Sequence, residues 1–269
     1  MLNINKTYQR AHGDIDVKIK HNQISKFFQS GSSKVFYPKC HDEIKELVLV
    51  NTAGGLTSGD QFSYKIDINN ESSVFVTTQT AERAYKGLEK SSNIKVELSI
   101  DRSSNLYWIP QELILFNNCN LRRDINVNVK GCSNFLLAET TIFGRTAMGE
   151  YLEEGTFIDN WRIYEDTKLL HAEALNLTGN IKEQLSKIAS TNSGVAICNI
   201  FVCGKNFLNN EDELKKNIIN TETVLLSHSK WNDKLLVRMV AQDAYDLKKI
   251  QKKILLCLSN NSLPKVWNN

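Results

Sequence analysis

Residues 94–100 read Ile-Lys-Val-Glu-Leu-Ser-Ile, with apolar and polar side chains in strict alternation. This alternation predicts a β-strand that buries one face and leaves the other in solvent. Residues 125–129, Ile-Asn-Val-Asn-Val, continue the same pattern further along the chain. Apolar, β-branched and aromatic runs predict more strands at residues 46–50, 62–68, 74–78, 112–116, 157–164, 168–175, 194–203 and 235–241. The sequence therefore predicts a mainly β protein.

Helical signals are fewer and lie mostly late in the chain. In residues 243–258, Leu247, Ile250, Ile254 and Leu258 recur at helical spacing and form an apolar stripe on one face of a C-terminal helix. Shorter helices are predicted at residues 181–189, 211–219 and 80–88. Because the chain has only 3 prolines and 13 glycines, many turns are expected at asparagine pairs, namely residues 69–70, 117–118, 209–210 and 260–261.

The composition excludes several classes of protein. The 269 residues carry 33 Lys and Arg against 30 Asp and Glu, a net charge of +3, which gives no strong field and does not favour nucleic acid as a partner. No apolar run reaches the roughly 18–20 residues of a membrane helix, and the first residues lack the apolar core of a secretory signal. The six cysteines contain no Cys-x-x-Cys pair and are typical of reduced thiols. We therefore expect a cytoplasmic protein, one domain over residues 1–269, that binds neither nucleic acid nor membranes.

The most glycine-dense stretch, residues 51–60, reads Asn-Thr-Ala-Gly-Gly-Leu-Thr-Ser-Gly-Asp and follows a predicted strand. The glycines favour a tight connection between strands, in which they supply positive φ. The alternative is an enzyme that uses loop 54–60 to bind an anionic small molecule, with Ser58 or Asp60 as its reactive group. Against a phosphate loop, no Gly-Lys-Ser/Thr follows, and the G-x-G-x-x-G spacing is absent.

Other chemistry-bearing patterns are weak. Residues 77–83, Thr-Thr-Gln-Thr-Ala-Glu-Arg, suggest a strand end that passes into a capped helix. The histidines form no H-x-x-x-H or H-E-x-x-H pattern, and no G-x-S-x-G elbow is present. We therefore expect neither a preformed metal site nor a catalytic constellation.

Four segments, taken in order, resemble the urease accessory protein UreD family, also called UreH. Residues 49–60 are similar to its N-T-A-G-G-L-x-x-G-D loop, and residues 77–85 to its T-T-Q-x-A-E-x-x-Y stretch. Residues 108–123 carry W-I-P-Q-E-L-I-L-F and then L-R-R, and residues 143–150 read F-G-R-T-A-M-G-E, both of which resemble family motifs. Each motif is weak alone, but four in the right order are specific. The resemblance is strongest over residues 45–180 and 235–267.

This resemblance implies a mainly β fold of stacked sheets of the β-helix type, with a few short helices and a C-terminal helix. It also implies a role without catalysis. The family works with a helical UreF-type protein and a UreG-type GTPase, docks on apo-urease and assists nickel insertion, and it is associated with an internal passage for the ion. No tightly bound cofactor is expected, and nickel would be bound only transiently.

The site residues carried over from the motifs fall into two groups. A relay must release its ion, so spaced carboxylates suit it better than a closed Cys/His cage. The candidate nickel route consists of Asp60, Glu112, Glu139 and Glu150. The candidate partner and loop residues are Asn51, Gly54, Gly55, Gly59, Thr78, Gln79 and Arg145.

Overall fold

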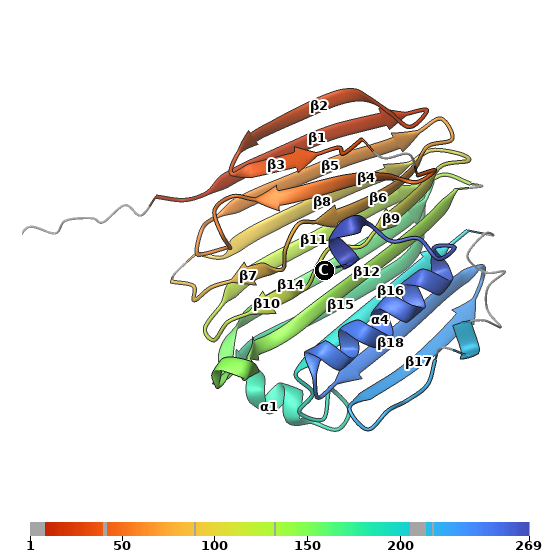
Figure 1. Cartoon of the computed structure of the whole chain (residues 1–269). Helices are drawn as coiled ribbons and strands as arrows, with labels where there is room; N and C mark the ends of the chain where they lie inside the picture. Colours follow the sequence, from red (N-terminus) through yellow and green to blue (C-terminus); the bar gives the residue numbers. More distant parts are fainter. Residues whose placement is uncertain are drawn as a thin grey trace, which may run out of the picture.

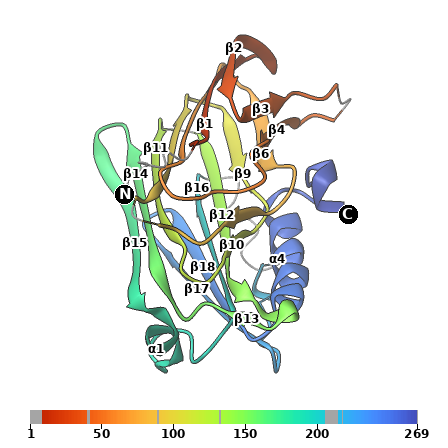
Figure 2. The same cartoon turned by 90° about the vertical axis from the view of Figure 1, so that its left-hand side faces the viewer.

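The computed structural model describes residues 9–39, 42–88, 90–131, 133–204, 214–216 and 218–268. In this part of the chain, two β-sheets lie face to face, one of seven strands and one of eleven. Figure 1 looks onto the larger sheet, whose outer face is crossed by helix α4 (Ala244–Leu258). Figure 2, turned by 90°, shows the sheets as two layers, with α4 outside the larger one.

The seven-stranded sheet has the order β15-β14-β11-β8-β5-β1-β2. Its five inner strands run parallel, while β2 and β15 are antiparallel edge strands. The bounds are β1 (His12–Lys20), β2 (Gln23–Gly31), β5 (Gln61–Asn69), β8 (Ser92–Ile100), β11 (Asn120–Val129), β14 (Glu154–Glu165) and β15 (Lys168–Asn180).

The eleven-stranded sheet has the order β17-β18-β16-β12-β9-β6-β4-β3, with β10 and β13 paired to β12 and β7 paired to β10. Strands β4, β6, β9 and β12 run parallel, and β3, β16, β17 and β18 pair antiparallel with their neighbours. Strand β10 pairs in parallel with both β12 and β7. The bounds are β3 (Ser33–Phe36), β4 (Lys45–Asn51), β6 (Ser73–Thr78), β7 (Glu82–Ala84), β9 (Asn105–Trp108), β10 (Leu113–Leu115), β12 (Asn134–Arg145), β13 (Glu150–Tyr151), β16 (Ala196–Cys203), β17 (Val224–Trp231) and β18 (Lys234–Ala241).

The chain passes back and forth between the sheets, from β4 to β5, β6, β8, β9, β11, β12 and β14. Each coil therefore adds one strand to each sheet, which is the stacked, β-helix-like arrangement that the resemblance implies. The alternation at residues 94–100 works as predicted, because Ile94, Val96, Leu98 and Ile100 are buried between the sheets. The predicted fold class is confirmed.

Helices are few in the described part of the chain. Helix α4 begins after Asp243, whose side chain accepts a hydrogen bond from the Asp246 amide, and it buries Leu247, Ile254 and Leu258 against the larger sheet. Helix α1 (Ile181–Ser186) is shorter than predicted, the 3-10 turns are η1 (Thr146–Met148) and η2 (Lys265–Asn268), and residues 214–216, inside the predicted helix 211–219, are also helical. None of these helices has the length and apolar character needed to cross a bilayer.

One predicted helix is wrong. Within residues 80–88, Glu82–Ala84 form strand β7, which pairs in parallel with β10. The local capping signal is overridden by this pairing with a later coil, which cannot be seen in the segment itself. Of the predicted helix 211–219, residues 211–213 and 217 lie outside the described residues, as does the asparagine pair 209–210.

The asparagine turns are confirmed where the structure describes them. Asn70, Asn118 and Asn260 have positive φ, as turn residues do. Cys198 and Cys203 lie on opposite faces of β16, one beneath α4 and one between the sheets.

Candidate functional site

The four sequence segments meet at one corner of the fold, which we call the motif corner. Leu56 pairs with Ala84, Ala84 with Leu115, and Leu115 with Phe143, always in parallel. One residue from each segment thus stands directly over the next on successive coils. The order of the motifs along the chain is the order of the coils in space.

A second stack lies on the outside of this corner. The Tyr85 hydroxyl donates a hydrogen bond to the Gly54 carbonyl at 3.2 Å, and the Tyr85 ring meets Phe116 edge to face at 4.8 Å. The Arg145 guanidinium lies 4.3 Å from the centre of the Phe116 ring. We call Gly54, Tyr85, Phe116 and Arg145 the corner stack. It joins all four segments, so part of what makes the motifs recognisable is the packing of coils on one another.

The glycine-dense loop is held mainly by its own polar groups. The Asn51 side chain accepts a hydrogen bond from the Ala53 amide at 2.9 Å and donates one to Glu82 at 3.0 Å. Asp60 is only 2% exposed, and its two carboxylate oxygens accept hydrogen bonds from the Ala11 and Thr57 amides, both at 2.8 Å. The predicted role of the loop as a tight connection is confirmed.

The glycines of this loop have the backbone angles that were expected. Gly54 has a φ of 78°, Gly55 of 149° and Gly59 of 81°. Residues other than glycine rarely adopt these backbone angles. The carboxylate of Glu82 next to the loop is partly buried, and burial raises its pKa, while the hydrogen bond from Asn51 works in the opposite direction.

Thr78 and Gln79 occupy different environments. The Thr78 hydroxyl accepts a hydrogen bond from the Gln111 amide at 2.9 Å and donates one to the Thr80 carbonyl at 3.0 Å. Gln79 is exposed, and its backbone amide donates to the Leu49 carbonyl at 3.0 Å. Thr78 therefore links two coils, while the Gln79 side chain faces solvent.

Two of the predicted nickel-route carboxylates form ion pairs away from the space between the sheets. Glu112 lies 2.7 Å from the Lys248 ammonium on α4. Glu150 pairs with Arg145 and accepts a hydrogen bond from the Asn117 amide at 2.9 Å. Burial works to raise the pKa of Glu150, but the Asn117 amide and the Arg145 guanidinium lower it overall.

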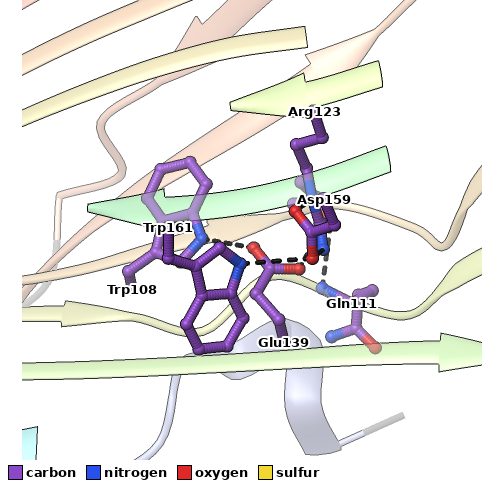
Figure 3. A network of polar contacts seen from close by, with 7 residues as sticks. Trp108, Gln111, Arg123, Glu139, Asp159 and Trp161 are labelled. Carbon is purple, nitrogen blue, oxygen red and sulfur yellow. Dashed lines mark hydrogen bonds and ion pairs between the residues drawn. The ribbon is translucent and has the colours of Figure 1, made fainter. Parts of the chain in front are cut away.

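The most unusual polar group lies at the centre of the inter-sheet core (Figure 3). Arg123, Glu139 and Asp159 point toward one another from β11, β12 and β14, with side chains only 7%, 4% and 8% exposed. The guanidinium donates to Asp159 through Nε and Nη2 at 2.9 and 2.7 Å, and to Glu139 through Nη1 at 2.5 Å. We call these three residues the buried ion cluster.

Two tryptophans complete the hydrogen bonding of the buried ion cluster. Trp108 Nε1 donates to Glu139 at 2.7 Å, and Trp161 Nε1 donates to Asp159 at 3.2 Å. Burial raises the pKa of Glu139, although the Arg123 charge opposes the shift. Burial works to lower the pKa of Arg123, but the Asp159 and Glu139 carboxylates raise it overall, so the guanidinium stays charged.

Two cavities border the cluster. The corner cavity, of about 80 Å³, reaches from exposed Gly54, Thr80 and Arg83 at the motif corner to buried Arg123 and Glu139. The edge cavity, of about 20 Å³, lies on the β15 side of the cluster. Its lining includes Glu139, Asp159, Trp161, Glu173 and Asn199. Glu139 lines both cavities, so a single carboxylate stands between them.

The four predicted nickel-route residues are thus not brought together. Glu139 alone among them lies between the sheets, whereas Asp60 holds the loop, Glu112 faces α4 and Glu150 pairs with Arg145. Over the ranges that the structure describes, no three His, Cys, Asp or Glu side chains lie close enough to hold a metal ion.

Arg123 and Asp159 are not among the site residues that the motifs predict, although the alternation of the strands contains a signal for both. Arg123 stands two residues before buried Ile125 on one strand, and Asp159 lies between buried Phe157 and Trp161 on another. A charged residue at an inward position of an alternating strand predicts a buried ion pair or a polar site.

Known proteins with similar sequences identify the family of this chain. The family model described as UreD urease accessory protein matches residues 9–268. A protein of Rhizobium leguminosarum bv. viciae named urease accessory protein UreD is 34% identical, over 97% of this chain and 96% of its own length. Similarly named proteins of Agrobacterium fabrum and Brucella anthropi are both 33% identical, over 97% and 96% of this chain and 92% and 95% of their own lengths. The chain therefore belongs to the UreD family of urease accessory proteins, which are maturation factors rather than enzymes.

Proposed function

We propose that this protein, together with UreF-type and UreG-type accessory proteins, docks on apo-urease and assists the insertion of nickel into its active site. Family membership supports a role in urease maturation. The observation that carries the nickel step is the buried ion cluster, because it places charge in a core that could have been wholly apolar. Glu139, at the boundary of the corner and edge cavities, is the residue that a moving cation would meet.

A weak, passing interaction suits this role. Among the described residues no three His, Cys, Asp or Glu side chains lie close enough to hold a metal ion, so a divalent cation beside Glu139 would be bound weakly and could move on. Nickel is therefore a cargo of this protein and not a resident cofactor. The buried thiols of Cys119, Cys198 and Cys203 suit a reducing compartment, and we assign the protein to the cytoplasm.

The motif corner is the proposed scaffold for partner proteins. Its coils are tied by the corner stack and by strand pairing, which holds the loops on a rigid base. Arg145 is nearly half exposed and belongs to this stack, so it is available to a partner surface. The alternative of an anion-binding enzyme loses support at loop 54–60, because the Leu56 and Thr57 amides donate to Arg83 and Asp60 inside the protein.

Urease produced with its other accessory proteins but without this chain is expected to remain largely inactive and poor in nickel. The measurement is urease activity and nickel content per active site after co-expression, with and without the chain. Nickel supplied in large excess is the control for a defect that is only kinetic. Normal nickel content and activity in the absence of the chain would refute the proposed function.

Glu139→Gln is expected to lower urease activation several-fold at limiting nickel. The amide oxygen still accepts the hydrogen bond from Trp108, but the negative charge that attracts a cation is lost. Arg123 keeps its bidentate pairing with Asp159, so the fold should persist. The matched control is Glu97→Gln on the outer face of β8, which is expected to have no effect. Unchanged activation at limiting nickel would exclude Glu139 from the ion route.

A further inference from the structure

The Arg123 side chain lies beside Glu139, the carboxylate that the two internal cavities share. It lines the corner cavity together with Glu139, and it holds Asp159, which lines the edge cavity. Its three hydrogen bonds to the two carboxylates close the gap between β12 and β14 at this point. The cavities therefore share Glu139 in their linings, and the arginine lines the corner cavity beside this shared carboxylate.

Stability alone gives a poor account of this arrangement. Three ionised groups between two sheets must all be desolvated, and well-packed apolar side chains of similar volume would serve the fold as well or better. The cluster also carries one more negative than positive charge, which is attractive to an additional cation. Arg123 already occupies the position between the carboxylates that such a cation would take.

We propose that Arg123 is a movable plug, which separates the corner cavity from the edge cavity and lets a divalent cation past Glu139 only when its guanidinium moves aside. This inference rests on the proposed function, because it names the residue that controls the passage of the ion. The corner cavity, of about 80 Å³, offers room on the Arg123 side of the cluster for the displaced end of the side chain.

The Arg123 side chain blocks the cation by its positive charge as well as by its bulk. With the guanidinium in place, an incoming dication meets a fixed positive charge in a medium of low dielectric, where repulsion over a few ångströms is strong. When the guanidinium swings into the corner cavity, Glu139 Oε2 and both Asp159 oxygens lose their arginine partner. The dication then replaces the arginine charge, and the cluster is never left with two unpaired carboxylates.

Tryptophan fluorescence reports on this passage, since Trp108 and Trp161 contact the cluster directly. The probe is Ni²⁺ alone, added to the purified full chain as a quencher, with partly exposed Trp231 replaced by phenylalanine in every sample. Arg123→Lys keeps the positive charge but cannot hold both carboxylates with a planar fork. Asp159→Asn is the second variant. It removes the carboxylate that accepts two hydrogen bonds from Arg123, and it leaves the arginine itself unsubstituted.

Ni²⁺ quenching is expected to rise several-fold in both variants relative to the parent. The matched control is Arg122→Lys, which alters the neighbouring arginine and its exposed pairing with Asp124 on the outer face of the same strand. This control should quench like the parent. Adding both Trp108→Phe and Trp161→Phe to Arg123→Lys should remove most of the gain, which locates the quenching at the cluster.

Quenching of folded Arg123→Lys or Asp159→Asn at the level of the parent would overturn the plug. If only one of the two variants folds, as judged by a cooperative melting transition, its quenching alone decides. The proposed function is tested separately by co-expression without the chain. If urease maturation requires the chain but its folded variants quench like the parent, the proposed function holds and the role of Arg123 as a plug is rejected.

Discussion

Arg123→Ala is expected to lower the free energy of unfolding by about 3 to 5 kcal/mol at pH 7, the usual cost of removing one partner from a buried ion pair. The variant leaves Glu139 and Asp159 close together in the core. Among the described side chains, the hydrogen-bond donors that remain are the Trp108 indole for Glu139 and the Trp161 indole for Asp159. Both carboxylates must then stay charged without a counter-ion or take up a proton. Chemical denaturation at fixed pH measures the loss.

The matched control for this prediction is the residue next in sequence. Arg122 also forms a bidentate pair, with Asp124 at 2.7 and 3.0 Å, but its side chain is 47% exposed on the outer face of the sheet. Exposed ion pairs contribute about 0 to 1 kcal/mol, so Arg122→Ala should be nearly neutral. Equal losses in the two variants would mean that the buried ion cluster has no special weight in the fold.

The Arg123→Ala deficit is also expected to shrink as the pH falls. Burial raises the pKa of Glu139 even with Arg123 present, and loss of the guanidinium raises it further. A carboxyl group whose pKa is higher in the folded than in the unfolded state, where it is about 4.3 for Glu, binds its proton more tightly in the folded state. Its contribution to stability is therefore fully present below the unfolded pKa and is lost as the pH rises through the folded pKa. Denaturation at about pH 5 should therefore show a smaller deficit than at pH 7. A deficit independent of pH would contradict the assignment of the cost to unpaired carboxylates.

The buried ion cluster also shows where sequence-based reasoning ends. Alternation alone predicts that position 123 faces the same side as Ile125, and that position 159 faces the same side as Phe157. Their contact depends on β11 and β14 pairing in parallel with Arg123 directly opposite Asp159, and on Glu139 facing them from the other sheet. Such register between distant strands leaves no local trace in either segment.

The same limit explains the incorrect helix at residues 80–88. The strand β7 exists because Glu82–Ala84 is paired with β10 on one side and, at Ala84, with Leu56 on the other. Strands β4, β5, β8 and β14, by contrast, were predictable because their apolar patterns reflect burial that each strand meets on its own. Strands at the corner form through pairing with neighbouring coils, whereas the central strands have an apolar pattern of their own that predicts them.

Gly55→Ala is expected to lower the free energy of unfolding by about 2 to 4 kcal/mol, since it combines backbone strain with a steric clash. Gly55 has a φ of 149°, and a Cβ placed there would lie 2.3 Å from Tyr85 Cε2 and 2.8 Å from the Arg83 carbonyl oxygen. That carbonyl accepts a 2.7 Å hydrogen bond from the Leu56 amide, which begins the column of paired residues at the motif corner. The clash therefore acts on the joint between the first two coils.

Two further variants separate the causes of this loss. Gly54→Ala also places a side chain at positive φ, but its Cβ meets nothing within 4 Å, so only the strain of about 1 to 2 kcal/mol should remain. Tyr85→Ala combined with Gly55→Ala removes the ring that the new Cβ strikes, and the double variant should lose less than the two single losses added together. Chemical denaturation of the full chain compares the parent with four variants, which are Gly54→Ala, Gly55→Ala, Tyr85→Ala and the double variant. Equal losses for Gly54→Ala and Gly55→Ala, with strict additivity in the double variant, would show that coil contact at the corner does not require glycine at position 55.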